Sequence, residues 1–540
     1  MRRRTCWVLA VLVSGCTARD TAPYFGRTTP RHGPDELWIN NSTEPEWIDP
    51  GKLSDGAGAE IAWNVFAGLL QADPRTLEPT PDLAERYERL DEGLRYRFFL
   101  RPAQWSDGHP LTAADVEWSW KRVLDPKTAS KTANLMSVLK GGAAFQRGEL
   151  PLGRVGVRAL DPETLEVELE SPLPYFLYLV ASYTFFPVPR HVIERLIAEG
   201  KDPDLWTRPE HIVSSGPYLL ESWRFRQELR FVKNPRYWDA ARVRTARIRV
   251  FEVESYNTTL NLYRTGELDW VGRNSNLPAE FMSHLEGYRD FRRSAINSVY
   301  FYWVNTRKPP LDDPQLRAAL SLAVDRESLV KYVGRAGQLP TADLVPDGLA
   351  GYRGLGRPLF DPERARALLA QTAYGRSAER APLILSYNTS EGHKQMAEAI
   401  QSMWQRHLGL QVILENQEWN TFVKRMQSGD FQIARYGWNG DYPDPFTFLE
   451  LLAGTNANNS SGWSSASYDA LLARANASTA AADRLALFRE AEAIGLDATP
   501  LIPLYVYSRS QLVKPYVGGF QLNYSDRHPW KDLYLREEAR

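Results

Sequence analysis

A strand–helix–strand unit in the C-terminal half of the chain constrains the fold most. Residues 383–387 and 410–414 are short apolar runs typical of strands. Between them, in residues 393–407, apolar side chains recur at the spacing of a helix. Gly409 is placed to end that helix, whose apolar face carries Met396, Ile400 and Met403. Because a crossover helix joins parallel strands, the unit predicts an α/β lobe.

Other local signals predict further elements of the same class. Thr112 and Asp115 have the spacing of a capping box that starts a helix over 113–124, and Asp313 with Pro314 starts another. A hairpin is expected over 155–169. Further predictions are strands over 37–40, 96–101, 229–232, 246–254, 297–305, 431–435 and 501–506, and helices over 60–70 and 258–265.

Charge and cysteine usage exclude several classes of protein. Lys plus Arg (65) nearly equals Asp plus Glu (66), so no overall field favours nucleic acid. The only cysteines, Cys6 and Cys16, lie before the predicted folded part, which therefore contains no disulfide and no cysteine-based metal site. We predict neither a metal nor a cofactor.

The N-terminus has the pattern of an export signal. Met1 is followed by three arginines, and residues 6–13 are apolar but too few to span a bilayer, which predicts a signal peptide over 1–15. The sequence V-S-G-C ending at Cys16 resembles a lipobox, so lipidation of Cys16 is expected, with ordinary cleavage as the alternative. Residues 16–36 are polar and rich in Pro and Gly, which predicts a flexible tether.

A Gly- and aromatic-rich stretch at 436–445 has the character of a recognition loop. Gly437 would leave the end of the 431–435 strand open, and Asp441 would stand beyond it with Trp438 and Tyr442 as apolar walls. A carboxylate there could receive a ligand ammonium. The alternative is a Gly/Pro turn whose Asp caps its own backbone.

Several ordered motifs resemble those of the bacterial oligopeptide-binding proteins of ABC importers. Besides the 437–441 loop, they are W-S-D-G (105–108), D-P-K-T-A-S (125–130), Y-N-T-S (387–390), E-N-Q-E-W (415–419) and L-V-K-P-Y-V-G-G (512–519). The resemblance implies a two-lobed periplasmic-binding-protein fold of type II, cluster C, with an extra domain and a hinge between the lobes. It implies lobe I from 37–66, 191–292 and 509–540, extra domain II over 67–190 and lobe III over 293–508.

The resemblance also implies site residues. Asp441 would bind the α-ammonium of a peptide and Arg435 its carboxylate. Other expected binding residues are His393, Trp419, Gly437, Trp438 and Tyr507. The residues alone leave capping or exposure open for His393, core burial for Trp419 and Trp438, and a lobe-interface role for Tyr507.

Three departures from the family pattern bear on ligand length. Related receptors often have a Glu where this chain has Ser54-Asp55-Gly56, and a ligand-facing Tyr is expected where Thr132 stands. Met426 occupies a position that can hold a second carboxylate-binding Arg. The adjacent Arg425 would point in a different direction.

The function expected is a receptor that captures short peptides between closing lobes and delivers them to an ABC permease. Its other partner would be the membrane, through the N-terminal lipid, and it would act as a monomer without nucleic acid. A peptide-signal receptor and a binder of sugars or metal chelates remain alternatives. A hydrolase is a weaker one, since the chain has no H-E-x-x-H, phosphate-loop or G-x-S-x-G motif.

Overall fold

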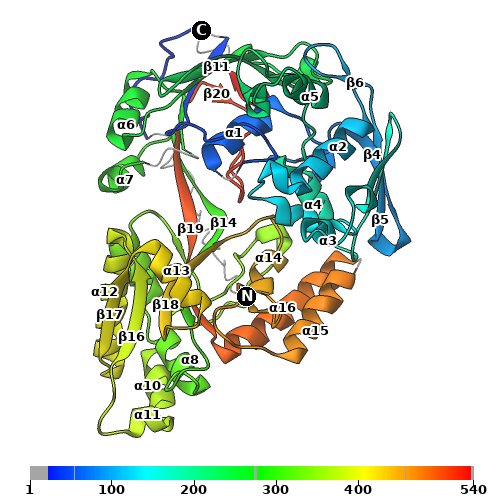
Figure 1. Cartoon of the computed structure of the whole chain (residues 1–540). Helices are drawn as coiled ribbons and strands as arrows, with labels where there is room; N and C mark the ends of the chain where they lie inside the picture. Colours follow the sequence, from blue (N-terminus) through cyan, green and yellow to red (C-terminus); the bar gives the residue numbers. More distant parts are fainter. Residues whose placement is uncertain are drawn as a thin grey trace, which may run out of the picture.

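One mixed sheet of eleven strands organises the computed structural model, which describes residues 22–33, 35–53, 55–272, 277–456, 458–478 and 480–536 (Figure 1). The predicted signal peptide and Cys16 lie outside these residues. The strand order is β10-β11-β12-β1-β13-β19-β14-β18-β16-β17, with β15 paired to β19. These strands are β1 Glu36–Asn40, β10 Tyr218–Arg224, β11 Glu228–Lys233, β12 Arg247–Phe251, β13 Trp270–Val271, β14 Phe291–Val304, β15 Leu339–Pro340, β16 Leu383–Asn388, β17 Val412–Gln417, β18 Ile433–Asn439 and β19 Leu501–Val513.

The predicted strand–helix–strand unit is confirmed. Strands β16 and β17 are parallel and are joined by helix α12, Glu391–Leu408, whose end is capped by Gly409 in the left-handed conformation. Met396 and Ile400 are buried, whereas Met403 is only half-buried. Trp404, one residue further on, is fully buried and donates its indole N–H to the Leu320 carbonyl at 2.8 Å.

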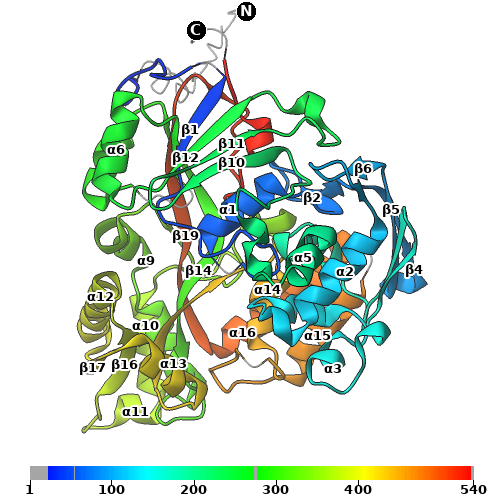
Figure 2. The ribbon, with the colours of Figure 1, turned by 45° about the horizontal axis from the view of Figure 1, so that its top comes forward.

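Two long strands, β14 and β19, connect the upper and lower parts of the molecule (Figure 1 and Figure 2). Their antiparallel ladder has two irregularities. In the larger one Ala295 pairs with Ser508 but the next pair is Val299 with Val506, and a smaller shift lies between Tyr300 and Phe301. The residues between Ala295 and Val299 therefore bulge out of the ladder. Such an irregularity bends a strand and re-aims its side chains.

A smaller sheet and three strand pairs complete the β structure. The four-stranded sheet has the order β4-β5-β9-β8, and the antiparallel pair β8–β9 is the hairpin expected over 155–169. These strands are β2 Leu70–Ala72, β3 Pro79–Pro81, β4 Ala84–Leu90, β5 Arg95–Leu100, β6 Ala103–Gln104, β7 Pro110–Leu111, β8 Val157–Asp161, β9 Thr164–Glu168, β20 Val517–Gly518 and β21 Tyr534–Leu535.

Helices cover both parts, and the predicted start signals hold. The capping box of Thr112 and Asp115 begins α2, and Asp313 with Pro314 begins α8. The helices are α1 Gly56–Val65, α2 Ala113–Leu124, α3 Gly142–Gln146, α4 Phe176–Val180, α5 Arg190–Ala198, α6 Tyr256–Thr265, α7 Met282–Leu285, α8 Pro314–Leu322, α9 Arg326–Ser328, α10 Pro362–Gln371, α11 Ala373–Arg376, α12, α13 Trp419–Gln427, α14 Phe446–Leu449, α15 Ala466–Ala477 and α16 Ala481–Ala498.

Several predicted boundaries are wrong, and two of them have a clear local reason. The helix expected over 60–70 is α1, which begins at Gly56 because the Asp55 carboxylate accepts the Gly58 N–H at 2.7 Å. The strand expected to end at Arg435 is β18, which continues to Asn439 because β14 offers it a full set of partners, from Val304–Ile433 to Ser298–Asn439. Gly437 thus lies inside a ladder, opposite Tyr300, and does not open the strand end.

Residues 22–33 of the expected tether pack against the folded chain. The Arg27 N–H donates to the Arg264 carbonyl at 2.9 Å, and Phe25 packs against Tyr263. His32 and Asp269 form a buried pair with atoms 2.9 Å apart. The prediction of flexibility therefore does not describe this part. No helix among the described residues is long and apolar enough to cross a membrane.

Candidate ligand-binding site

The loop that carries Asp441 is held by the bulge in β14. Asn297, inside that bulge, accepts the Gly440 N–H with its own carbonyl at 2.8 Å. Its side-chain amide donates to the carbonyls of Gly440 and Tyr442 at 3.2 and 3.0 Å. A Cβ added to Gly440 would lie 2.1 Å from the Asn297 amide nitrogen, so glycine is needed for this close approach.

The Asp441 carboxylate has no cationic partner among the described residues. Its backbone N–H donates to the Thr447 hydroxyl at 3.1 Å, but its side chain caps nothing. The side chain is accessible to solvent, yet nearby protein desolvates the carboxyl and raises its pKa above the usual range. The alternative of a self-capping turn fits Asp444 instead, which accepts the Phe446 N–H at 2.9 Å and pairs with Arg484 at 2.5 Å.

The surroundings of Asp441 add negative charge. Glu450 accepts the Tyr442 hydroxyl at 3.1 Å. Desolvation, together with the charges of Asp441 and Asp444, raises the pKa of Glu450 to about 7 despite that hydrogen bond. A cation bound at Asp441 would be attracted by these carboxylates and would reduce the repulsion between them.

Arg435 is the counterpart of Asp441, a cation without an anion. It lies half-buried on β18, where its guanidinium sits 4.7 Å from the centre of the Tyr300 ring. Its hydrogen bonds, both at 3.3 Å, reach only the neutral side chains of Asn388 and Tyr507, and its buried Nε has no partner among the described residues. No described carboxylate lies within ion-pair distance of it.

His393 lies beside Arg435, as the sequence suggested, and Tyr507 accepts a hydrogen bond from the same arginine. His393 is in the first turn of α12, and its Nδ1 is 3.2 Å from the Tyr300 hydroxyl. Burial, reinforced by the charge of Arg435, lowers the pKa of His393 to about 4, so its imidazole is neutral at pH 7. It can offer a carboxylate a hydrogen bond but not a charge.

The two tryptophans lie apart from this cluster. Trp438 is half-buried on the opposite face of β18 and donates to the same Thr447 hydroxyl as the Asp441 backbone, at 3.4 Å. Trp419 is 50% exposed at the start of α13 and stacks on Phe422. Core burial is therefore wrong for Trp419, whereas Trp438 packs half-buried against a core cluster, and binding by either tryptophan stays a prediction.

The positions that depart from the family pattern lie in different environments. Met426 is buried in the core beneath α13, and Arg425 pairs instead with Glu415 and Asp430 at 3.0 and 3.1 Å. Thr132 accepts a hydrogen bond from Thr184 at 3.4 Å. Asp55 caps α1, and Ser54 lies outside the described residues. Arg425 thus does not replace a second carboxylate-binding Arg at position 426.

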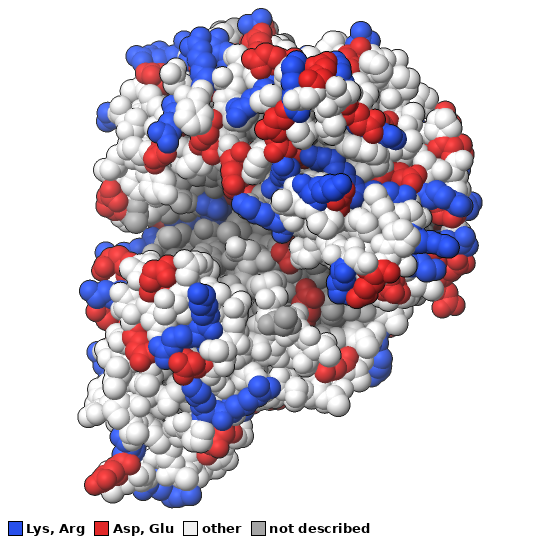
Figure 3. All heavy atoms as spheres, viewed as in Figure 1, with Lys and Arg blue, Asp and Glu red and all other residues white. Residues whose placement is uncertain are grey.

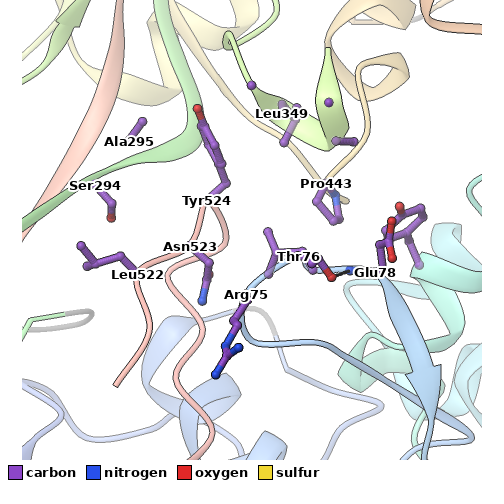
Figure 4. Close-up of a pocket in the computed structure, with 15 residues that line it drawn as sticks. Arg75, Thr76, Glu78, Ser294, Ala295, Leu349, Pro443, Leu522, Asn523 and Tyr524 are labelled. Atoms are coloured by element: carbon purple, nitrogen blue, oxygen red, sulfur yellow. Dashed lines mark hydrogen bonds between the residues drawn. The ribbon is translucent and has the colours of Figure 1, made fainter. Parts of the chain in front are cut away.

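A surface hollow and two cavities lie near the residues of the candidate site. The surface is hollowed between the upper and lower parts (Figure 3). A cavity of about 500 Å³ is lined by His393 and Tyr507, together with Arg335, Gln338, Met396 and Tyr505. Another, of about 560 Å³, lies between Pro443 of the loop and the region of Ser294 and Tyr524, and its opposite wall holds Arg75 and Glu78 (Figure 4). None of the predicted binding residues lines this second cavity.

A family model, "Bacterial extracellular solute-binding proteins, family 5 Middle", matches residues 78–460. The chain belongs to this family. The relative named "Probable deoxycholate-binding periplasmic protein YgiS" of Escherichia coli is 35% identical, over 99% of each chain. The "Oligopeptide-binding protein OppA" of Bacillus subtilis is 33% identical, over 93% of each.

Solved family 5 structures share the fold. The unliganded open form of MppA, a "Periplasmic Murein Tripeptide Binding Protein", superposes with a TM-score of 0.83 at 30% identity, over 94% of this chain and 98% of that one. The expected two-lobed periplasmic-binding fold is thereby confirmed, and two of these relatives, YgiS and MppA, are named as periplasmic binding proteins. The lobe boundaries expected from sequence remain a prediction.

Sequence reasoning missed three residues that position the site: Asn297, Tyr300 and Thr447. Tyr300 lies between Arg435 and His393, and Thr447 joins Trp438 to the Asp441 backbone. Alternation along the 297–305 strand could have placed Tyr300 on one face. Asn297 had no such signal, because its role depends on a bulge.

Proposed function

We propose that this family 5 protein binds short peptides between its lobes and delivers them to an ABC permease. A single observation carries the proposal: one partly desolvated carboxylate, Asp441, and one half-buried guanidinium, Arg435, each lack an opposite charge within the part of the chain that the structure describes. A peptide with free termini supplies both missing charges. Charge-assisted hydrogen bonds to such groups are stronger than neutral ones.

The spacing of the two groups suits a peptide of a few residues. Six residue steps separate Arg435 from Asp441, at most about 20 Å in extended chain. Extended peptides of two to five residues span about 7–18 Å, and the arginine side chain and bridging water shorten the gap. His393 and Tyr507 would join Arg435 at the carboxylate end, and Trp438 and Gly437 would lie near the ammonium end.

Relatives support the same reading, since several are named as oligopeptide- or dipeptide-binding proteins. The lobes would be those expected from sequence, 37–66, 191–292 and 509–540 for lobe I and 293–508 for lobe III, with 67–190 as the extra domain. The pairing of β13 with β19 at Val513 supports a lobe I that includes the C-terminal segment. A monomer anchored through lipid at Cys16 completes the proposal.

A second candidate ligand is a single organic anion, favoured by the unpaired Arg435 and by the name of the YgiS relative. Such a ligand would meet Arg435 but would leave Asp441 without a partner. Calorimetry with deoxycholate and with short peptides, on the same preparation, separates the two. Binding of deoxycholate alone would replace the peptide proposal.

The deciding experiment replaces the carboxylate of Asp441 with a neutral amide. Asp441→Asn keeps the shape and removes the charge, so peptide affinity should fall by about 2–5 kcal/mol, as when one member of a desolvated charge pair is lost. N-acetylated peptides should bind the wild type comparably badly, and the two losses should not add. Arg425→Gln, in the surface ion pairs of α13, is the control and should bind normally. Equal calorimetric affinity of free and acetylated peptides for the wild type would contradict the proposal.

A further inference from the structure

The W-S-D-G motif is not used by the peptide site, and it lies in a separate cluster. Asp107 and His109 belong to the turn between β6 and β7. The Trp105 N–H donates to the His109 carbonyl at 2.8 Å, and the Gly108 N–H donates to the Trp105 carbonyl at 2.9 Å. Gly108 has a φ of +95°, and the Asp107 carboxylate accepts the His109 N–H at 3.1 Å. The turn is therefore fixed before any ligand arrives.

A second histidine reaches the same carboxylate from helix α5. His191, the second residue of α5, places its Nε2 2.7 Å from the Oδ2 of Asp107, and His109 places its Nδ1 3.0 Å from that atom. The two imidazole rings stack with centres 4.3 Å apart and an angle of 26°. One possible ligand atom from each of the three side chains lies within 4.8 Å of the others.

We propose that Asp107, His109 and His191 bind a divalent transition-metal ion of the zinc, nickel or copper class. Two imidazoles and one carboxylate are ligands that suit these ions. All three side chains are partly exposed, so water would complete the coordination. Two arginines lie close to the site. Arg190 pairs with Glu194 at 2.7 Å, whereas the Arg236 guanidinium lies beside Gly108 and donates to the neutral side chain of Gln104 at 3.5 Å.

The competing explanation is a plain hydrogen-bond network in which both imidazoles donate to Asp107. That network needs a proton on each nitrogen that faces the carboxylate. A metal ion would take the place of both protons, and each proton would move to the other nitrogen of its ring, so the ion needs both imidazoles in their neutral form. The bound ion would tie the β6–β7 turn to α5.

Titration calorimetry of the mature chain, purified without a polyhistidine tag, tests the site with ZnCl₂ and NiCl₂ at pH 7.5. We expect one ion per chain, and visible absorption bands when Co²⁺ is the probe. His109→Ala, His191→Ala and Asp107→Asn should each weaken binding by more than about tenfold, since loss of outer-shell partners alone costs 10–100-fold. His407→Ala, on α12, is the matched control and should bind like the wild type.

Two results would overturn the proposal: no stoichiometric ion on the wild type, or unchanged affinity in all three variants. Because His109 is exposed, its variant should keep the wild-type circular dichroism, and Asp107→Asn provides a second check that preserves the shape of the turn. Peptide affinity should be the same in these variants as in the wild type. The metal site and the peptide site can therefore fail independently.

Discussion

At the scale of single residues, the cleft holds charges that the protein itself leaves unmatched. Arg435 lies on β18 and Asp441 in the loop that follows it, and among the described residues each has aromatic or hydroxyl neighbours in place of an opposite charge. Leaving a charge desolvated costs stability, so a fold that retains two such groups gains from a ligand that carries both opposite charges.

His393 provides a pH test of this environment. Its pKa of about 4 in the folded chain lies below the ordinary value of 6.5, because burial and Arg435 disfavour the imidazolium. The unfolded chain therefore takes up the proton first, and the free energy of unfolding should fall as pH drops from about 6.5 to about 4. His393→Gln should lose less stability over this window in urea titrations. Identical pH profiles would show that His393 titrates normally.

The sequence could predict part of this site. Asp441, Arg435, His393 and Tyr507 follow from the resemblance to peptide-binding proteins, and the structure brings the last three together. The neutral state of His393 could not be predicted, because it depends on how deeply the ring is buried and on its distance to Arg435. The role of Asn297 could not be predicted either, because the alternation of side chains along a strand does not indicate where a β-bulge occurs.

At the scale of elements, β18 and the loop after it form one rigid support. The strand pairs with β14 as far as Asn439, and Asn297 then takes over by binding the backbone of Gly440 and Tyr442. The sequence placed the strand but ended it too early, because Gly437 reads locally as a breaker while Tyr300 supplies a partner across the ladder. Likewise β14 begins at Phe291, earlier than expected, since Arg292 and Arg293 interrupt its apolar pattern.

Gly440→Ala tests this support. The added methyl group would meet the Asn297 amide at 2.1 Å, so either the loop or Asn297 must move, and overpacking of this kind costs about 1–3 kcal/mol. Urea unfolding should show that loss, and peptide affinity should fall because Asp441 moves with the loop. Gly153→Ala is the control, since its added Cβ meets nothing within 4 Å. Unchanged stability and affinity in Gly440→Ala would mean that the loop tolerates displacement.

At the scale of the whole molecule, β14 and β19 are the strands that pass between the two parts, and their ladder is interrupted between Ala295 and Val299. The sheet strands and the α/β class could be predicted from periodicity. Their assembly into one eleven-stranded sheet could not, because it joins Trp270 to Val513, which are far apart in sequence.

Closure about this interruption should be visible in solution. The superposition on an open, unliganded relative leads us to expect that a bound peptide draws the lobes together and lowers the radius of gyration in small-angle X-ray scattering. Asp441→Asn at the same peptide concentration should stay near the unliganded value. A radius that does not change when calorimetry shows saturation would exclude hinge closure.

Anchoring is tested at Cys16. The several acyl chains of a bacterial lipoprotein hold a protein on a membrane, whereas one chain gives only marginal attachment. Cys16→Ser should therefore move the protein from the membrane to the soluble extracytoplasmic fraction without changing peptide affinity. Recovery of the wild type in the soluble extracytoplasmic fraction would show that the chain is cleaved without lipidation.

Because residues 22–33 pack against the folded chain, they shorten the linker between the lipid and the body of such an anchored receptor. Pro23 accepts the Arg289 N–H and Lys514 donates to the carbonyls of Phe25 and Arg27, so the arm is part of the upper body. Only residues 16–21 precede it, and six residues reach at most about 22 Å. The folded body of a receptor lipidated at Cys16 would therefore stay close to the membrane surface, with helices α6 and α7 on the side nearest the lipid.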